Sequence, residues 1–363
     1  MKKTVQILTF VVCFLNAHSQ SPVRARDLGI PFDGTPGKFN AITDVDSVLV
    51  GYNTLIKGDG KFVLGEGPVR TGVTVILPRG KTMEPAPAAI FTMNGDGEMT
   101  GVESIEDYGF NYGAIGITNT NSVGVVRDGI GSWNVKHFFQ SPYDFSFGLP
   151  VAAETWDGYL NDINGMHVTQ QDVFDALDSA KTGLIEEGNV GGGTGMALFH
   201  FKGGSGTSSR VFTIDSNHYT VGVFVQANFG GRKELMVRGV PVGKEISDLL
   251  PVVNREKDGS IIIIIATNAP LLPSQLKLVA RHATLALGRV GSVVHNGSGD
   301  IFLAFSTQAP LMNAKGSVQT WNTISKEYLD PIYTATVDAT EEAILNVLIA
   351  AKTTAQIPLA RPS

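Results

Sequence analysis

Residues 258–273 read Asp-Gly-Ser-Ile-Ile-Ile-Ile-Ile-Ala-Thr-Asn-Ala-Pro-Leu-Leu-Pro, so that five isoleucines follow directly on Ser260. β-Branched side chains favour strands, and a strand that is apolar on both faces has to be covered on both sides. The run Ile261–Ile265 therefore predicts a central strand in a layered α/β or α+β body, with Ser260 at the first position of that strand.

Two interpretations of Ser260 follow from the residues in front of it. Asp258-Gly259 is a typical turn pair, so Ser260 can simply begin the second strand of a hairpin. Alternatively, the serine hydroxyl attacks the carbonyl of Gly259, because glycine tolerates strained dihedral angles and leaves its carbonyl open. The peptide would become an ester, water would release a new N-terminus, and the freed α-amine would help to activate the hydroxyl beside it.

Apolar runs of strand type recur outside this segment, and helical patterns lie between them. We find no internal repeat and no low-complexity linker. Further strands are expected at Ser47–Ile56, Gly72–Leu77, Ala88–Met93, Val221–Ala227, Glu234–Val240 and Asp300–Ser306. Helices are expected after caps at Thr169 (with Asp172), Ser274 and Asp338 (with Glu341).

Composition excludes several classes of protein. The chain has 363 residues, of which 43% are hydrophobic and 17% charged, so it is not a disordered chain. A net charge of −6 argues against nucleic-acid and anionic-membrane partners, which need a basic surface. The single cysteine excludes an internal disulfide framework, and no paired-histidine metal motif occurs. We therefore expect no metal and no cofactor.

The first 19 residues have the layout of a secretory signal peptide. Met1-Lys2-Lys3 is basic, Val5–Leu15 is apolar, and Ala17-His18-Ser19 offers small residues for cleavage. The apolar run is well short of the roughly 20 residues that span a membrane. Cleavage after Ser19 would remove two lysines and take the net charge from −6 to −8. The mature chain is thus expected to be periplasmic or secreted.

Six blocks of sequence resemble the DmpA-type self-processing serine aminopeptidases, a family that includes the L-aminopeptidase/D-Ala-esterase/amidase and the β-peptidyl aminopeptidases. The blocks follow the order of that family from about residue 25 to 310. They are 117–124 (ITNTNSVG), 153–158 (AETWDG), 188–196 (GNVGGGTGM), 225–230 (VQANFG), 258–273 and 296–306 (NGSGDIFLAFS). The resemblance implies an α+β fold, a four-layer αββα sandwich that the ornithine acetyltransferases share.

The resemblance also implies how the chain is processed. Ser260 matches the family nucleophile, and Gly259–Ser260 matches the bond that the precursor cleaves in itself. The products would be an α chain of residues 20–259 and a β chain of residues 260–363, and both would stay in one folded domain, 20–363. A strand that begins in the core cannot leave without exposing its isoleucines, at roughly 1.5–3 kcal/mol each.

Four further residues match the family site. Asn228 matches an oxyanion-hole asparagine, Ser298 and Asp300 match a second serine and its acidic partner, and Glu154 matches the group that holds the substrate's free α-amine. Trp156 would wall the side-chain pocket. Some relatives carry Glu in place of Asp300, whose arm is shorter. Read alone, Asn228 and the Ser298–Asp300 pair would be turn residues, and Trp156 would be core. The glycines at 188–196 fit no nucleotide motif and predict a loop that lets backbone approach the active site closely.

The expected function is therefore a self-cleaving N-terminal-serine aminopeptidase or amidase that releases the first residue of small peptides, amides or esters. Whether that residue is an L-α-, D-α- or β-amino acid stays open. The resemblance implies a homo-oligomer, often four αβ units. Two alternatives remain: a periplasmic binding protein with an intact chain, and an acyl transferase similar to the ornithine acetyltransferases. The latter usually cleave before a threonine, so Ser260 and the signal peptide argue against that alternative.

Overall fold

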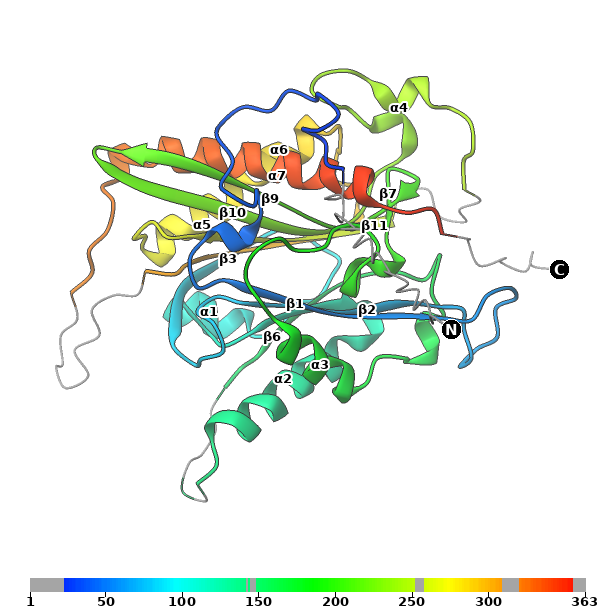
Figure 1. The fold of residues 1–363 in the computed structure, drawn as a ribbon, viewed down its shortest axis with the longest axis horizontal. Coiled ribbons are helices and arrows are strands. Elements are labelled where there is room, and N and C mark those ends of the chain that lie inside the picture. The colour runs from blue at the N-terminus through cyan, green and yellow to red at the C-terminus, as the bar shows by residue number, and fades with distance from the viewer. Residues whose placement is uncertain (1–22, 142, 144–147, 252–257, 309–319, 355–363) are drawn as a thin grey trace, which may run out of the picture.

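The computed structural model describes residues 23–141, 143, 148–251, 258–308 and 320–354. The expected signal peptide, residues 1–19, lies outside the described residues. Two β-sheets face each other, and helices cover the outer side of each (Figure 1). The four-layer αββα sandwich is thereby confirmed.

The larger sheet contains the predicted central strand. It has six strands in the order β4-β3-β12-β11-β10-β9, and the facing sheet has four in the order β1-β2-β5-β6. A short hairpin, β7-β8, stands apart from both. The strands are β1 Leu49–Lys57, β2 Val69–Leu77, β3 Pro85–Gly95, β4 Phe110–Tyr112, β5 Ile115–Asn119, β6 Val151–Thr155, β7 Ala197–Leu198, β8 Phe201–Lys202, β9 Gly204–Ile214, β10 Asn217–Asn228, β11 Asp258–Thr267 and β12 Gly297–Ser306.

The helices form the two outer layers. In Figure 1, α7 lies along β9 and β10 on the outer side of the larger sheet, and α2 and α3 lie beneath the four-stranded sheet. None of the helices in the described part of the chain has the length and apolar character to span a bilayer. The helices are α1 Val102–Tyr108, α2 Val123–Phe138, α3 Gln170–Ser179, α4 Val242–Glu245, α5 Pro273–His282, α6 Thr284–Arg289 and α7 Asp330–Ala350.

The isoleucine run contributes side chains to the hydrophobic core on both faces of the larger sheet. Ile261, Ile263 and Ile265 pack toward the helices, whereas Ile262 and Ile264 pack between the two sheets. All five side chains are buried. Each such burial stabilises the fold by about 1.5–3 kcal/mol. The prediction of a strand that is covered on both faces is confirmed.

The hairpin interpretation of Asp258-Gly259 is wrong. Both residues belong to β11, where Gly259 pairs with Ser298 of the parallel neighbour β12. The antiparallel neighbour β10 ends at Asn228, and residues 229–257 connect it to β11. A turn dipeptide therefore continues a strand, because its pairing with β12 outweighs its local preference for a turn.

Three other local predictions need correction. Glu234–Val240 does not form a sheet strand: Arg232–Glu234 is a short 3-10 helix, and Val237 and Val240 form only an isolated bridge. The helix expected after Ser274 begins at Pro273, a residue that suits the first helical position because it has no N–H. The helix expected after Asp338 begins at Asp330, so Asp338 lies well inside α7. The capping box of Thr169 and Asp172 at α3 is confirmed.

Candidate active site

Ser260 lies where two neighbouring strands carry polar residues to the same end of the larger sheet. It pairs with Asn228 at the end of β10 and with Gly299 near the start of β12. The serine is buried, and its Oγ accepts a hydrogen bond of 3.3 Å from the backbone N–H of Trp156, just after β6. The Gly259–Ser260 bond is thus surrounded by residues from three strands.

The pairing also decides which side chains share a face. Laterally paired residues point to the same side of a sheet, so Ser260, Asn228 and Gly299 face the four-stranded sheet, while Ser298 and Asp300 face the helices. A Cβ added to Gly299 would lie 2.7 Å from Gly97 Cα, on the side of β6. The Ser298–Asp300 pair therefore lies on the opposite face of the sheet from the hydroxyl of Ser260.

Ser298 and Asp300 form a buried hydrogen-bonded pair. The hydroxyl of Ser298 donates to Oδ1 of Asp300 over 2.9 Å, so both side chains point the same way, as strand alternation predicted. Burial raises the pKa of Asp300 to about 6, although the hydrogen bond from Ser298 opposes that rise. Oδ2 of Asp300 makes no hydrogen bond with any residue that the structure describes. Asp300 is therefore not the solvated turn residue of the alternative interpretation.

The side-chain amide of Asn228 is held in one orientation. Its Oδ1 accepts a hydrogen bond of 2.8 Å from the N–H of Ala197, and its Nδ2 donates one of 2.7 Å to the carbonyl of Trp156. Because the oxygen is committed to Ala197, the NH₂ group is turned toward Trp156, the residue whose backbone N–H donates to Oγ of Ser260. An amide in this orientation can donate to a developing oxyanion.

Glu154 lies on β6, the strand of the facing sheet that approaches Ser260. Its carboxylate accepts hydrogen bonds from the backbone N–H of Glu98 (3.0 Å) and from the hydroxyl of Thr120. A Cβ added to Gly97 would lie 3.2 Å from Oε1 of Glu154 and 2.9 Å from Cα of Gly299. Glu154 is thus close to the residue that pairs with Ser260.

The surroundings of Glu154 are acidic. Burial raises the pKa of Glu154, and the carboxylates of Glu98 and Asp96 raise it further, while the hydrogen bonds from Thr120 and Glu98 oppose the rise. Carboxylates that repel one another bind a cation more favourably than a single one does. This side of the site suits an ammonium group.

The sequence allowed two positions for Trp156, in the wall of the side-chain pocket or in the core. Its side chain keeps 38% of its accessible surface, so the core-packing alternative is wrong. The ring meets Tyr159 edge-on, with 4.8 Å between centroids. Tyr159, and not Trp156, lines the adjoining cavity.

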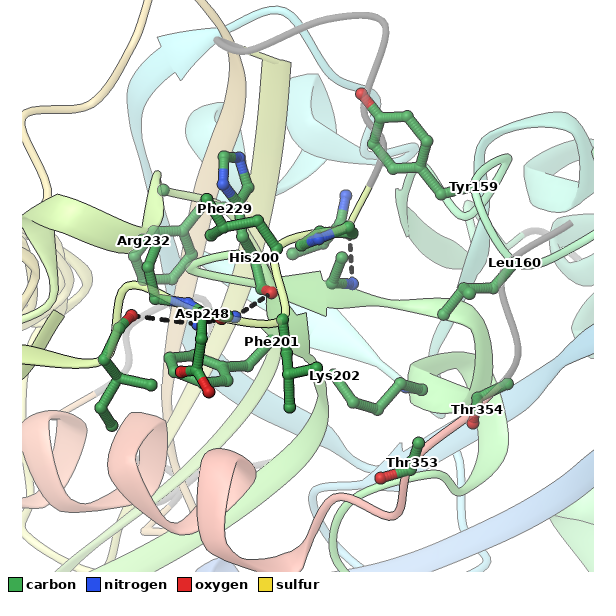
Figure 2. Close-up of a pocket in the computed structure, with 17 residues that line it drawn as sticks. Tyr159, Leu160, His200, Phe201, Lys202, Phe229, Arg232, Asp248, Thr353 and Thr354 are labelled. Atoms are coloured by element: carbon green, nitrogen blue, oxygen red, sulfur yellow. Dashed lines mark hydrogen bonds between the residues drawn. The ribbon is translucent and has the colours of Figure 1, made fainter. Parts of the chain in front are cut away.

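A cavity of about 530 Å³ adjoins Asn228 (Figure 2). Aromatic and aliphatic side chains line most of it, and Lys202 and Arg232 are the cations at its wall. Its lining includes Tyr159, Leu160, Ala197, His200, Phe201, Lys202, Asn228, Phe229, Arg232, Asp248, Leu249, Leu250, Thr353 and Thr354. A mostly apolar cavity with a few polar groups is the usual form of a small-molecule site.

The glycine-rich segment fits tightly between the sheets. Gly191–Gly195 form a buried 3-10 helix. A Cβ on Gly192 would collide with the side-chain oxygen of Gln226 and lie 2.7 Å from the carbonyl oxygen of Ile117. Glycine at these positions therefore permits close backbone contact with both sheets, and the approach of this segment to the active site stays a prediction.

Two charged residues of this region were not predicted. Lys202 on β8 donates from Nζ to the carbonyls of Gly203 (2.7 Å) and Met196 (3.0 Å), and burial lowers its pKa to about 7. Asp157, after β6, is buried, and burial raises its pKa to about 7. No motif singles out Lys202, whereas Asp157 stands inside the quoted block 153–158 without a role. Among the described residues no cluster of His, Cys, Asp and Glu could hold a metal ion.

Comparison with protein families and curated proteins gives one consistent result. The profile of peptidase family S58 matches residues 40–358. The chain is 49% identical over 354 residues to the β-peptidyl aminopeptidase BapA of Sphingosinicella microcystinivorans, covering 93% of this chain and 88% of that protein. It is 45% identical over 361 residues to that of Sphingosinicella xenopeptidilytica, covering 96% and 90%.

Solved structures agree with these sequence matches. The L-aminopeptidase D-Ala-esterase/amidase of Ochrobactrum anthropi superposes with a TM-score of 0.86 at 45% identity, over 92% of this chain and 93% of that chain. That enzyme is described as a prototype for the serine aminopeptidases and a variant of the Ntn hydrolase fold. A β-aminopeptidase of Burkholderia sp. superposes with a TM-score of 0.83 at 42% identity, over 92% and 95%.

Proposed function

This chain belongs to peptidase family S58 and is a serine aminopeptidase/amidase with the Ntn (N-terminal nucleophile) hydrolase fold, and from that premise we propose that Ser260 is its nucleophile, released by self-cleavage of the Gly259–Ser260 bond. The observation that carries the proposal is the position of Ser260 between Asn228 and Gly299, next to the Ser298–Asp300 pair. Donor, acid and nucleophile thereby meet at one strand end.

Maturation proceeds in two steps. Oγ of Ser260 attacks the carbonyl carbon of Gly259, the C–N bond breaks, and the nitrogen takes up the proton that the hydroxyl gives away. Water then hydrolyses the resulting ester, which leaves a carboxylate on Gly259 and an α-amine on Ser260. The chain becomes the α chain 20–259 and the β chain 260–363, and the amine has an ordinary pKa of about 8, suitable for a base.

Turnover uses the same atoms. The α-amine takes the proton of the Ser260 hydroxyl as Oγ attacks the substrate carbonyl, and the Nδ2 group of Asn228 donates to the oxyanion. The amine then protonates the leaving nitrogen as the C–N bond breaks, and water clears the acyl-enzyme. Ser298 and Asp300 lie on the face from which they can hold the α-amine in the sheet plane.

The acidic side of the site supports an aminopeptidase rather than an endopeptidase. We assign Glu154 the substrate's free ammonium group, since its carboxylate lies near Gly299 and has the carboxylates of Asp96 and Glu98 around it. Glu154→Gln should raise KM for substrates with a free amine by about 10-fold or more, because a charged hydrogen bond is worth about 1.5–3 kcal/mol. Comparison with N-acetylated substrates checks this: an equal loss on both would remove the assignment.

Replacement of the nucleophile tests the proposal directly. Ser260→Ala should leave one band on a denaturing gel and no p-nitroanilide hydrolysis, whereas the wild type should show two fragments, the smaller beginning Ser-Ile-Ile-Ile. Ser292→Ala is the matched control, because that serine lies outside the strand and should leave cleavage and turnover unchanged. A processed, active Ser260→Ala protein would overturn the proposal, and an intact but active wild type would favour a different nucleophile.

A more specific question is which class of amino acid the enzyme releases from the N-terminus of its substrate. The names of the curated relatives, at 45–49% identity, support a β-amino acid with a free amine as the residue released. We therefore expect β-homoamino p-nitroanilides to give a higher kcat/KM than the L-α and D-α counterparts. A panel of the three classes measures this directly, and a preference for the L-α series would refute the β assignment while leaving the nucleophile in place.

Export and assembly complete the proposal. The basic start and apolar run within residues 1–19 support cleavage of a signal peptide and a periplasmic or secreted enzyme. The family resemblance supports an oligomer of αβ units, of which four is the expected number. N-terminal sequencing of exported protein and light scattering of the purified enzyme test these two points separately.

A further inference from the structure

Lys202 is the last residue of the short β7–β8 hairpin, and the same hairpin donates a hydrogen bond to the side chain of Asn228 on β10. The hairpin pairs Ala197 of β7 with Lys202 of β8. The ammonium of Lys202 does not extend to solvent but turns back, donating to the carbonyls of Met196 (3.0 Å) and Gly203 (2.7 Å), with a longer contact of 3.4 Å to that of Gly193. Among the described residues it makes no salt bridge, so backbone carbonyls are its hydrogen-bond partners.

One peptide group connects Lys202 to Asn228. The carbonyl that accepts from Lys202 belongs to Met196, and the N–H of the same peptide group belongs to Ala197. That N–H donates to Oδ1 of Asn228 over 2.8 Å, and Nδ2 of Asn228 donates onward to Trp156 O over 2.7 Å. Ammonium, peptide and side-chain amide therefore form a chain of three hydrogen bonds that all run in one direction.

Hydrogen bonds in such a chain polarise one another. A cation at the carbonyl of Met196 draws electron density from the peptide, which makes the N–H of Ala197 a stronger donor. That N–H in turn draws density from Oδ1 of Asn228 and makes its NH₂ group a stronger donor. The same bonds also prevent the amide from rotating by half a turn, which would present Oδ1 to the oxyanion and repel it.

We propose that Lys202 is a positioning residue that orients and polarises the Asn228 amide for oxyanion binding through the Met196–Ala197 peptide group. This inference rests on the role proposed for Asn228. Lys202 itself does not touch the reacting atoms, so its effect should appear in the chemical step rather than in substrate binding. Lys233, an exposed lysine of the short 3-10 helix Arg232–Glu234, provides a matched control.

A double-mutant cycle tests the proposal. Lys202→Met keeps the length of the side chain and removes the ammonium, and it should lower kcat by about 10- to 100-fold with KM within about twofold, less than the 10²–10³ loss expected when an oxyanion donor is removed outright. In an Asn228→Ala background the same substitution should have no further effect, because residues that act through one another are not additive. Lys233→Met should change neither constant.

kcat is calculated per processed active site, whose concentration is determined from the β-chain band on a gel. The rate of precursor cleavage is measured as a second readout. If Lys202→Met does not fold, Lys202→Gln, which keeps a donor but no charge, takes its place; if Asn228→Ala is not processed, Asn228→Ser replaces it. Independent, multiplicative losses, or a change confined to KM, would overturn the inference. An active Ser260→Ala protein would instead overturn the proposed function, so the two failures are distinguishable.

Discussion

At the scale of single residues, the buried carboxyl of Asp300 sets a pH dependence. The pKa of Asp300 is raised to about 6, so its carboxyl is mostly charged only above that pH, and the charged form accepts the stronger hydrogen bond from Ser298. Activity should therefore rise as the pH increases through about 6. Asp300→Asn should lower kcat/KM by about 10²–10⁴-fold and abolish this acid limb.

The control for that substitution keeps the charge. Asp300→Glu should retain an acid limb and a larger share of the activity, since the longer arm still reaches Ser298 after a rotamer change. A pH profile of kcat/KM for the three proteins decides the matter. An unchanged limb near pH 6 in Asp300→Asn would show that another group is responsible.

Asp157 gives a second prediction, on stability. Its folded-state pKa of about 7 lies above the ordinary value of 3.8, so the folded protein binds this proton more tightly than the unfolded chain does. The contribution of Asp157 to the free energy of unfolding is then greatest below pH 4 and is lost as the pH rises toward 7. Asp157→Asn should make the melting temperature decline less between pH 4.5 and 7. Asp107→Asn, at an exposed position on α1, should follow the wild-type curve.

At the scale of elements, an apolar run or a capping box in the sequence was enough to predict some of the strands and helices. The isoleucine run marked β11, and the Thr169–Asp172 capping box marked the start of α3. β9 was missed because its buried half consists of Gly, Ser, Thr and Arg210, which do not form an apolar run. These small residues are needed there because a Cβ on Gly206 would collide with the Ala343 carbonyl of α7, a contact that no strand pattern reveals.

The residues of the candidate site also fall into a part that the sequence predicted and a part that only the fold defines. The family blocks supplied Ser260, Asn228, Glu154 and the Ser298–Asp300 pair, and the fold brings all five to one end of the sheets. Their roles are not readable from their spacing, because contacts across strands create them. Lys202 has no sequence signal at all, since its connection to Asn228 passes through a backbone peptide whose position only the folded hairpin defines.

The glycine-rich 3-10 helix allows a test at this scale. A Cβ at Gly192 would press against Gln226 and against the Ile117 carbonyl, neither of which can move without disturbing a sheet. Gly192→Ala should therefore destabilise the protein by about 1–3 kcal/mol, measured by denaturant unfolding. Gly288→Ala on α6, where a Cβ meets nothing within 4 Å, should instead stabilise it by about 0.5–1 kcal/mol. Equal effects at both positions would contradict the packing account.

At the scale of the whole molecule, the proposed cleavage does not divide the fold. β11 and β12 belong to the β chain, yet they lie between β3 and β10 of the α chain in one sheet. After processing, the two chains should elute together in size-exclusion chromatography and separate only in denaturant. Dissociation of the cleaved chains in plain buffer would argue against a shared core.

The interleaving of strands has a consequence for any attempt to make the two halves from separate genes. α7 packs on β9 and β10, so neither polypeptide would possess a complete hydrophobic interior on its own. The second reading frame would also start with methionine, which has to be removed before the serine nitrogen is free. The proposed self-cleavage would avoid both difficulties, since folding would precede the cut and the cut would leave nothing in front of the serine.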